Sequence, residues 1–136
     1  MTCLLKISEA GILALHAAAL MALDREKHLS VHDMAVVLKA SEHHLAKVLQ
    51  RLTKAGIAVS VRGPKGGFML AKRADQLSML EVFEAVEGPI GEPDCLLGLG
   101  SCVVEKCMLG DAFFQINALV RERLKGNSLA SFAQKK

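Results

Sequence analysis

The sequence contains no tryptophan and no tyrosine, and phenylalanine occurs only 5 times in 136 residues. RNA-binding modules commonly stack unpaired bases on exposed aromatic side chains, so this chain has few residues for that mode of binding. Proline is also rare, and 51% of the residues are apolar, which is too hydrophobic for a disordered protein. We therefore expect one folded domain, or one domain with an arm, and we expect any nucleic-acid partner to be a duplex.

Long hydrophobic segments and paired cysteines are absent as well. The longest apolar stretch, Ala10–Leu23, is interrupted by His16 and is too short to span a bilayer. It has the length of a signal-peptide core, but only Lys6 and the acidic Glu9 precede it. The 4 cysteines form no Cys-x-x-Cys pair, and the composition is not that of a small disulfide scaffold, which fits a reducing compartment. The sequence predicts a cytoplasmic protein without a membrane partner.

Positive charge is concentrated in the middle of the chain. Between Lys39 and Arg73, eight Lys or Arg residues accompany a single acidic residue, Glu42, so this segment has a net charge of +7 in a chain of formal net charge +3. The remaining residues therefore carry a net charge of −4. This separation indicates a basic surface for a polyanion rather than an evenly solvated exterior.

Hydrophobic periodicity predicts three helices in the first half of the chain. Ser8, Ser30 and Ser41 each stand where an N-cap belongs, and apolar residues at helical spacing follow each of them. The predicted helices cover residues 8–23, 30–39 and 42–55. Gly56 suits a left-handed cap at the end of the third. A β-hairpin is predicted next, with strands at 57–61 and 68–71 and a glycine-rich tip at 62–67.

Two further helices are predicted in the second half, separated by a loop. Ser78 and Glu81 have the spacing of a capping box at the start of a helix over 78–86. Glycines and prolines then forbid regular structure until about residue 109. A helix over 109–124 has one apolar face that needs a partner surface, and a polar, flexible tail is expected to follow it.

Two short helices joined by a minimal turn and followed by a hairpin are typical of the winged helix-turn-helix. The sequence therefore predicts a mainly α fold with a small β-hairpin. The second helix of such a pair enters the major groove, which makes 42–55 the predicted recognition helix. A solvated face without a partner is the alternative for any one of its polar residues. The residues of this region predicted to contact DNA are Ser41, Glu42, His43, His44, Lys47, Gln50, Arg51 and Lys54.

The hairpin tip, Arg-Gly-Pro-Lys-Gly-Gly at 62–67, is the second predicted DNA contact. Arg62 and Lys65 supply two cations, and Gly66 and Gly67 allow the backbone to approach a narrow groove or phosphates closely. A plain tight turn would need fewer glycines and no flanking charge. A nucleotide-binding phosphate loop is excluded, because a strand rather than a helix follows and no Lys-Ser or Lys-Thr pair follows the glycines.

Three motifs together resemble one protein family. They are Val-Arg-Gly-Pro-Lys-Gly-Gly-Phe at 61–68, Ala-Lys-Val-Leu-Gln-Arg-Leu-x-Lys-Ala-Gly at 46–56, and three downstream cysteines. This combination resembles the Rrf2 family of bacterial winged-helix transcriptional regulators, the IscR/NsrR family, over nearly the whole chain. The resemblance implies a homodimer whose long C-terminal helices cross, with each wing and recognition helix on one half of a near-palindromic operator. Residues 1–87 are then the DNA-binding domain, 88–108 a cysteine-bearing cluster loop, and 109–136 a dimerisation helix with a flexible tail.

Cys95, Cys102 and Cys107 lie in the glycine- and proline-rich loop, where their thiolates can converge. Structural zinc usually takes four ligands arranged as close pairs, so zinc is an alternative that this spacing does not favour. Soft thiolates suit an iron–sulfur cluster, and in members of the resembled family three such cysteines hold a [2Fe-2S] or [4Fe-4S] cluster. We therefore predict an iron–sulfur cluster as the cofactor, with unliganded thiols as a further alternative.

The fourth cluster ligand stays open at this point. One family member uses a histidine shortly after its third cysteine, but Cys107 is followed by Met-Leu-Gly-Asp. Some relatives take a carboxylate or histidine from the first helix of the other subunit, and Glu9 and His16 share one helix face. Ungapped comparison places Ile12 at the position of that carboxylate and His16 at the position of the histidine. Glu9 can instead stabilise the helix N-terminus, and His16 can be an interface residue held by a hydrogen bond.

The function predicted from these residues is a dimeric DNA-binding regulator of transcription, either a repressor or an activator. Its operator affinity is expected to depend on an iron–sulfur cluster that senses redox state, nitric oxide or iron supply. One alternative keeps DNA binding and makes the thiols a disulfide switch without a cluster. Another is an iron–sulfur assembly scaffold, although a scaffold would have no use for the basic wing. No nucleophile with a positioned base is visible, so no enzymatic activity is predicted.

Overall fold

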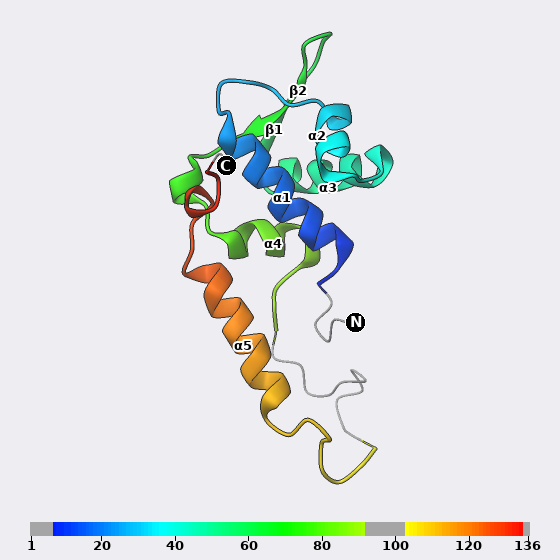
Figure 1. The fold of residues 1–136 in the computed structure, drawn as a ribbon, viewed down its shortest axis with the longest axis vertical. Coiled ribbons are helices and arrows are strands. Elements are labelled where there is room, and N and C mark those ends of the chain that lie inside the picture. The colour runs from blue at the N-terminus through cyan, green and yellow to red at the C-terminus, as the bar shows by residue number, and fades with distance from the viewer. Residues whose placement is uncertain (1–6, 92–102, 135–136) are drawn as a thin grey trace.

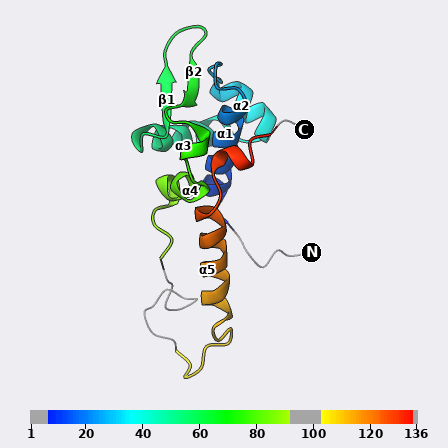
Figure 2. The ribbon, with the colours of Figure 1, turned by 90° about the vertical axis from the view of Figure 1, so that its left-hand side faces the viewer.

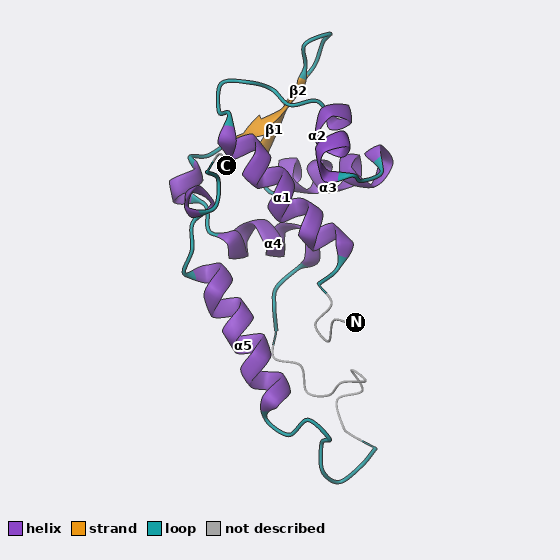
Figure 3. Cartoon of the chain, viewed as in Figure 1, coloured by secondary structure: helices purple, strands orange, loops and turns teal. Residues whose placement is uncertain are grey.

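The computed structural model describes residues 7–91 and 103–134, and helices dominate it (Figures 1 and 3). The helices are α1 (Glu9–Leu23), α2 (Val31–Leu38), α3 (Glu42–Lys54), α4 (Met79–Glu87) and α5 (Ala112–Lys125). Strands β1 (Ala58–Val61) and β2 (Gly67–Leu70) form one antiparallel pair, and short 3₁₀ segments cover Ala74–Gln76 and Leu129–Ser131. The predicted mainly α fold with a small hairpin is confirmed. No helix among the described residues combines the length and hydropathy needed to cross a bilayer.

The first four helices begin where the sequence supplies a serine cap. In each case the serine hydroxyl accepts a hydrogen bond from the backbone N–H three residues later, which satisfies one donor that the first turn leaves open. Ser78 and Glu81 form both halves of a capping box. After α3, Gly56 takes a φ of +76°, a conformation that glycine adopts without a Cβ clash. These local signals explain why the predicted helix starts agree closely with the observed ones.

The core is built around α1, which passes through the middle of the body and packs against α2, α3, α4 and β2 (Figures 1 and 2). Ala14, Ala17 and Ala18 on α1 are fully buried, so the neighbouring helices can approach it closely. The predicted apolar stripe of α3 is buried against this helix; it consists of Leu45, Val48, Leu49 and Leu52. Burial of one stripe fixes the rotation of α3 about its axis and leaves the opposite face in solvent.

The hairpin is attached to the connection between α1 and α2. Leu29 and Phe68 exchange two backbone hydrogen bonds, with N···O distances of 2.9 and 2.8 Å. Phe68 also packs against the core and pairs with Ser60 across the two strands. The tip of the hairpin therefore projects beyond the body from a fixed base, at the end of the molecule opposite α5 (Figure 1).

The segment after α5 differs from the flexible tail expected for the end of region 109–136. Leu129 is fully buried in the core, and its N–H donates to the carbonyl of Leu77 at 2.7 Å. The N–H of Met79 donates to the carbonyl of Asn127 at 3.0 Å, which adds a second tie. Burial of Leu129 removes a large apolar side chain from water, which favours the return of this segment to the body.

Candidate nucleic-acid interface

Four of the predicted recognition residues lie together on the exposed face of α3. Because the apolar stripe is turned inward, Lys47, Gln50, Arg51 and Lys54 line one shallow hollow of about 380 Å³ on the outside of the helix. Three cations and one amide on a single helix face can bind phosphate oxygens and hydrogen-bond to base edges. The predicted grouping of these side chains is therefore present in the fold.

The first turn of α3 is tied to neighbouring residues. Ser41 acts as the N-cap, because its hydroxyl accepts from the N–H of His44 at 3.3 Å. Glu42 lies with Oε1 2.5 Å from Nδ1 of His32 on α2, and this hydrogen bond, with the negative charge of the carboxylate, raises the pKa of His32. His43 is exposed. The sequence analysis did not predict the contact between His32 and Glu42, since no local pattern pairs residues of two separate helices.

Arg51 has a second role that the sequence did not reveal. Its Nη1 donates to the carbonyl oxygen of Val86 at 3.1 Å. Val86 lies in the last turn of α4, where carbonyls have no partner within their own helix. Arg51 therefore links α3 to α4. A guanidinium has five N–H donors, so this bond leaves donors for a phosphate.

Both predicted cations of the wing are exposed at its tip. Arg62 and Lys65 stand on either side of Gly63 and Pro64 in the turn between the strands. Gly63 has a φ of +116°, a region that side-chain-bearing residues rarely adopt. The tip is closed by a hydrogen bond of 2.9 Å from the N–H of Gly66 to the carbonyl of Gly63. The two charges are thus presented on a tight turn and not on a loose loop.

Gly66 and Gly67 have a structural explanation within the chain itself. A Cβ at Gly66 would lie 2.1 Å from the carbonyl oxygen of Val61, and a Cβ at Gly67 would lie 2.4 Å from that of Leu29. Both distances are far inside van der Waals contact, so any side chain here would push the wing apart. The expectation that these glycines serve close approach to DNA is therefore not needed to explain their presence; the packing of the hairpin already requires them.

The cysteine loop is only partly within the described residues. Cys107 is exposed, as are all residues from 103 to 110, whereas Cys95 and Cys102 lie outside the described residues. Within 7–91 and 103–134, no group of three or more His, Cys, Asp or Glu residues is arranged to hold a metal ion. The predicted three-cysteine site stays a prediction, to which the described structure contributes one accessible sulfur.

The two candidate fourth ligands lie on α1. His16 is exposed, and its Nδ1 lies 2.8 Å from the carbonyl oxygen of Ile12, so Nδ1–H is the donor and Nε2 is left to accept. A metal-binding histidine commonly has this arrangement, with one ring nitrogen on a backbone carbonyl and the other on the metal. Glu9 is mostly exposed, and its Oε1 lies 3.8 Å from Nδ1 of His44 on α3. Glu9 thus already has a polar neighbour on α3 of its own subunit.

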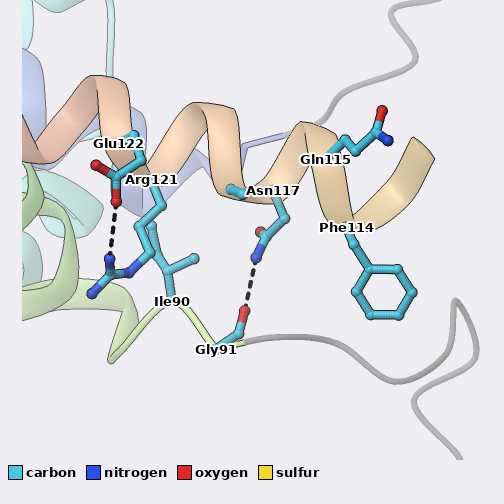
Figure 4. Close-up of a pocket in the computed structure, with 8 residues that line it drawn as sticks. Ile90, Gly91, Phe114, Gln115, Asn117, Arg121 and Glu122 are labelled. Carbon is cyan, nitrogen blue, oxygen red and sulfur yellow. Dashed lines mark hydrogen bonds and ion pairs between the residues drawn. The ribbon is translucent and has the colours of Figure 1, made fainter. Parts of the chain in front are cut away.

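The beginning of the cysteine loop is held against α5. Nδ2 of Asn117 donates to the carbonyl of Gly91 at 2.8 Å (Figure 4). Ile90 and Gly91 form one wall of a groove of about 640 Å³, and α5 forms the other. Arg121 and Glu122 border the same groove, and Nη1 of Arg121 lies 3.5 Å from Oε1 of Glu122. No pattern in the sequence predicted this contact, because an asparagine within an amphipathic helix has many possible roles.

A helix-turn-helix with an exposed basic second helix, followed by a hairpin with two cations at its tip, defines a winged helix-turn-helix protein. Residues 7–135 match the model of the Rrf2 family, described as iron-dependent transcriptional regulators. The chain belongs to the Rrf2 family, whose members are DNA-binding regulators of transcription. This assignment agrees with the resemblance seen in the wing and recognition-helix motifs.

Individual relatives support the same assignment. A putative HTH-type transcriptional regulator of Aquifex aeolicus is 31% identical over 119 residues, covering 85% of this chain and 83% of the relative. The HTH-type transcriptional regulator NsrR of Geobacillus kaustophilus is 35% identical over 61% of this chain, and the match spans only 57% of that protein. Among solved structures, CymR, the global cysteine regulator of Bacillus subtilis, has a TM-score of 0.76 and 28% identity, with 96% of this chain and 97% of that chain covered.

Proposed function

We propose that this Rrf2-family regulator acts as a homodimer that represses or activates transcription from an operator and that its affinity for DNA is set by an iron–sulfur cluster. The observation that carries the DNA-binding part is the single exposed face of α3, on which Lys47, Gln50, Arg51 and Lys54 lie together. Such a protein acts where the bacterial chromosome is, in the cytoplasm.

The operator contacts are assigned to two elements. The first turn of α3, from Ser41 to His44, enters the major groove, and the exposed face behind it meets bases and phosphates. Arg62 and Lys65 at the wing tip bind phosphates or a narrow minor groove. Gly66 and Gly67 contribute their backbone to this wing. Each contact to phosphate adds affinity for any duplex, and contacts to base edges select the sequence.

A second copy of the chain is the proposed partner of α5. None of the described residues of α5 is buried, although the helix has apolar residues along most of its length. Leu119 is 71% exposed, and with Val120, Arg123 and Leu124 it lines a groove of about 350 Å³. An unpaired apolar helix face is unfavourable in water, and a matching α5 covers both faces at once.

The donor set fits an iron–sulfur cluster better than a hard metal ion. Cys95, Cys102 and Cys107 would supply three thiolates, and His16 or Glu9 of the partner subunit would supply the fourth ligand. Of these two, His16 is favoured, since its Nδ1 bond to Ile12 leaves Nε2 to coordinate. A bound cluster supplies a redox-active group that oxygen, nitric oxide or loss of iron can alter. The cysteine loop is tied to α5 through Asn117. The ligands would therefore connect this loop of one subunit to α1 of the other.

The test is anaerobic purification followed by iron and acid-labile sulfide analysis and by gel shifts on genomic fragments. We expect bound iron and sulfide in the native chain, loss of both in Cys107→Ser, and different operator affinities for holo and apo protein. Equal affinity of the two forms would refute control by the cluster. The variants His16→Ala and Glu9→Ala separate the two candidate ligands, since only the true ligand changes the optical spectrum of the cluster.

A disulfide switch is the second candidate, favoured by the exposed thiol of Cys107. In that case the purified protein contains no iron or sulfide, and mild oxidants produce crosslinks that reductants reverse. DNA binding then follows the oxidation state of the thiols. Zinc without sulfide would identify a structural metal site instead.

A further inference from the structure

The helix-turn-helix contains a contact that the proposed function leaves unused. His32 near the start of α2 and Glu42 at the first position of α3 are joined by a hydrogen bond of 2.5 Å between Nδ1 and Oε1. Both side chains stay exposed, at 69% for His32 and 58% for Glu42. The contact therefore joins α2 and α3 at the surface of the protein.

The place of the contact matters because the start of the second helix is the part that approaches base edges. The bond uses one carboxylate oxygen of Glu42, so Oε2 is available to a third partner. An ionised carboxylate can only accept hydrogen bonds. In the major groove, the donors that suit it are the exocyclic amino groups, N4 of cytosine and N6 of adenine.

A lone carboxylate at this position would be repelled by the phosphates of the duplex. A protonated His32 compensates that charge and holds the carboxylate in one orientation. With the positive charge of His32 beside it, the carboxylate of Glu42 can accept a hydrogen bond inside the strongly negative groove. An exposed ion pair adds little to stability because water screens it, so the fold itself has little need of this pair.

We propose that Glu42 reads an exocyclic amino group of one base pair in each half of the operator, and that His32 is the positioning residue that holds Glu42 for this contact. The inference rests on the proposed binding of α3 in the major groove. It assigns sequence selectivity to a pair of residues from two helices, and it adds His32 to the residues on which recognition depends.

The pair also predicts a pH dependence. The charged groups that act on His32 are Glu42 from α3 and Asp33 on its own helix, and both raise its pKa, the hydrogen bond to Glu42 having the largest effect. His32 therefore keeps its proton to a higher pH than a histidine in the unfolded chain, whose pKa is about 6.5. The ionic contact is complete below that value and is lost as the pH rises through the pKa of the folded state.

The experiment measures the affinity of the full-length protein for operator duplexes in which each base pair is changed in turn. The operator is first obtained by selection from genomic fragments. We expect the wild type to discriminate roughly tenfold at one symmetric pair of positions and the variant Glu42→Ala to lose that discrimination there. A preferred cytosine or a preferred adenine at those positions identifies which amino group is read.

Two variants of His32 separate positioning from simple stability. His32→Ala removes the partner and should lose discrimination at the same positions as Glu42→Ala. His32→Gln keeps a donor that does not titrate, so it should retain part of the discrimination at every pH. In the wild type, discrimination should fall as the pH is raised. His28→Gln, a change at an exposed histidine in the turn before α2, is the matched control and should keep the wild-type profile.

Each other outcome overturns the inference. A uniform loss of affinity across all duplexes in Glu42→Ala and His32→Ala, with discrimination intact, would make the pair a structural link only. Unchanged discrimination and affinity in both variants would show that Glu42 reads no base. If the wild type binds no duplex at all, the proposed function itself fails, which is a distinguishable result. Thermal unfolding of His32→Ala in parallel shows whether the variant is folded in the assay.

Discussion

Replacing Lys65 with alanine gives the most quantitative test of the wing. Lys65 lies at the exposed tip of the hairpin, so its removal should cost the fold little. Each phosphate that a protein neutralises contributes about 0.9 to the slope of log affinity against log salt for B-form DNA. A dimer has two wings, so Lys65→Ala should make the slope shallower by about 1.8. Between about 50 and 200 mM salt, the variant should then lose roughly tenfold less affinity than the wild type.

The assay is fluorescence anisotropy on a labelled operator duplex over that salt range. Lys125→Ala is the matched control, because it removes the same charge from an exposed position on α5, outside the recognition helix and the wing. Its plot of log affinity against log salt should be parallel to that of the wild type. If the plot of Lys65→Ala is also parallel to that of the wild type, the tip of the wing does not touch phosphate and its placement on DNA is wrong.

Three further substitutions test separate parts of the structure. Arg51→Ala should weaken DNA binding and also lower the melting temperature, because the carbonyl of Val86 loses its donor; a fall in affinity alone would refute the link to α4. Leu129→Ala should destabilise the fold by about 2–5 kcal/mol in urea titration, whereas a change below about 0.5 kcal/mol would mean that the C-terminal segment is not docked. Leu119→Asp should shift the protein toward monomer in analytical ultracentrifugation, and an unchanged mass would exclude α5 from the interface.

The recognition helix shows how far local patterns extend. Its serine cap, its apolar stripe and its closing glycine are all visible within the sixteen consecutive residues from Ser41 to Gly56, and each corresponds to an observed feature. Because the stripe must be buried, the opposite face must be exposed, and the shared location of Lys47, Gln50 and Lys54 follows directly. The wing was recognisable for the same reason, since its strands and turn are contiguous.

The glycines of the wing show where reasoning from sequence found only one of two reasons for a residue. Gly66 and Gly67 suggested close approach to an external partner, but the backbone carbonyls of Val61 and Leu29 occupy the space where side chains would lie. Leu29 is far from the wing in sequence, and no local pattern predicts that it pairs with the hairpin. A requirement for glycine can come from within the protein or from a ligand, and composition does not separate the two.

The sequence by itself determined the order of the helices, the hairpin and the basic face of α3, because these follow from spacing along a continuous segment. Tertiary structure alone decided that Arg51 serves α4 as well as the surface, that His32 holds Glu42, and that Leu129 returns the C-terminal segment to the core. Each of these contacts joins residues of separate elements. Their pairing depends on how the helices pack around α1, and packing is a property of the whole chain.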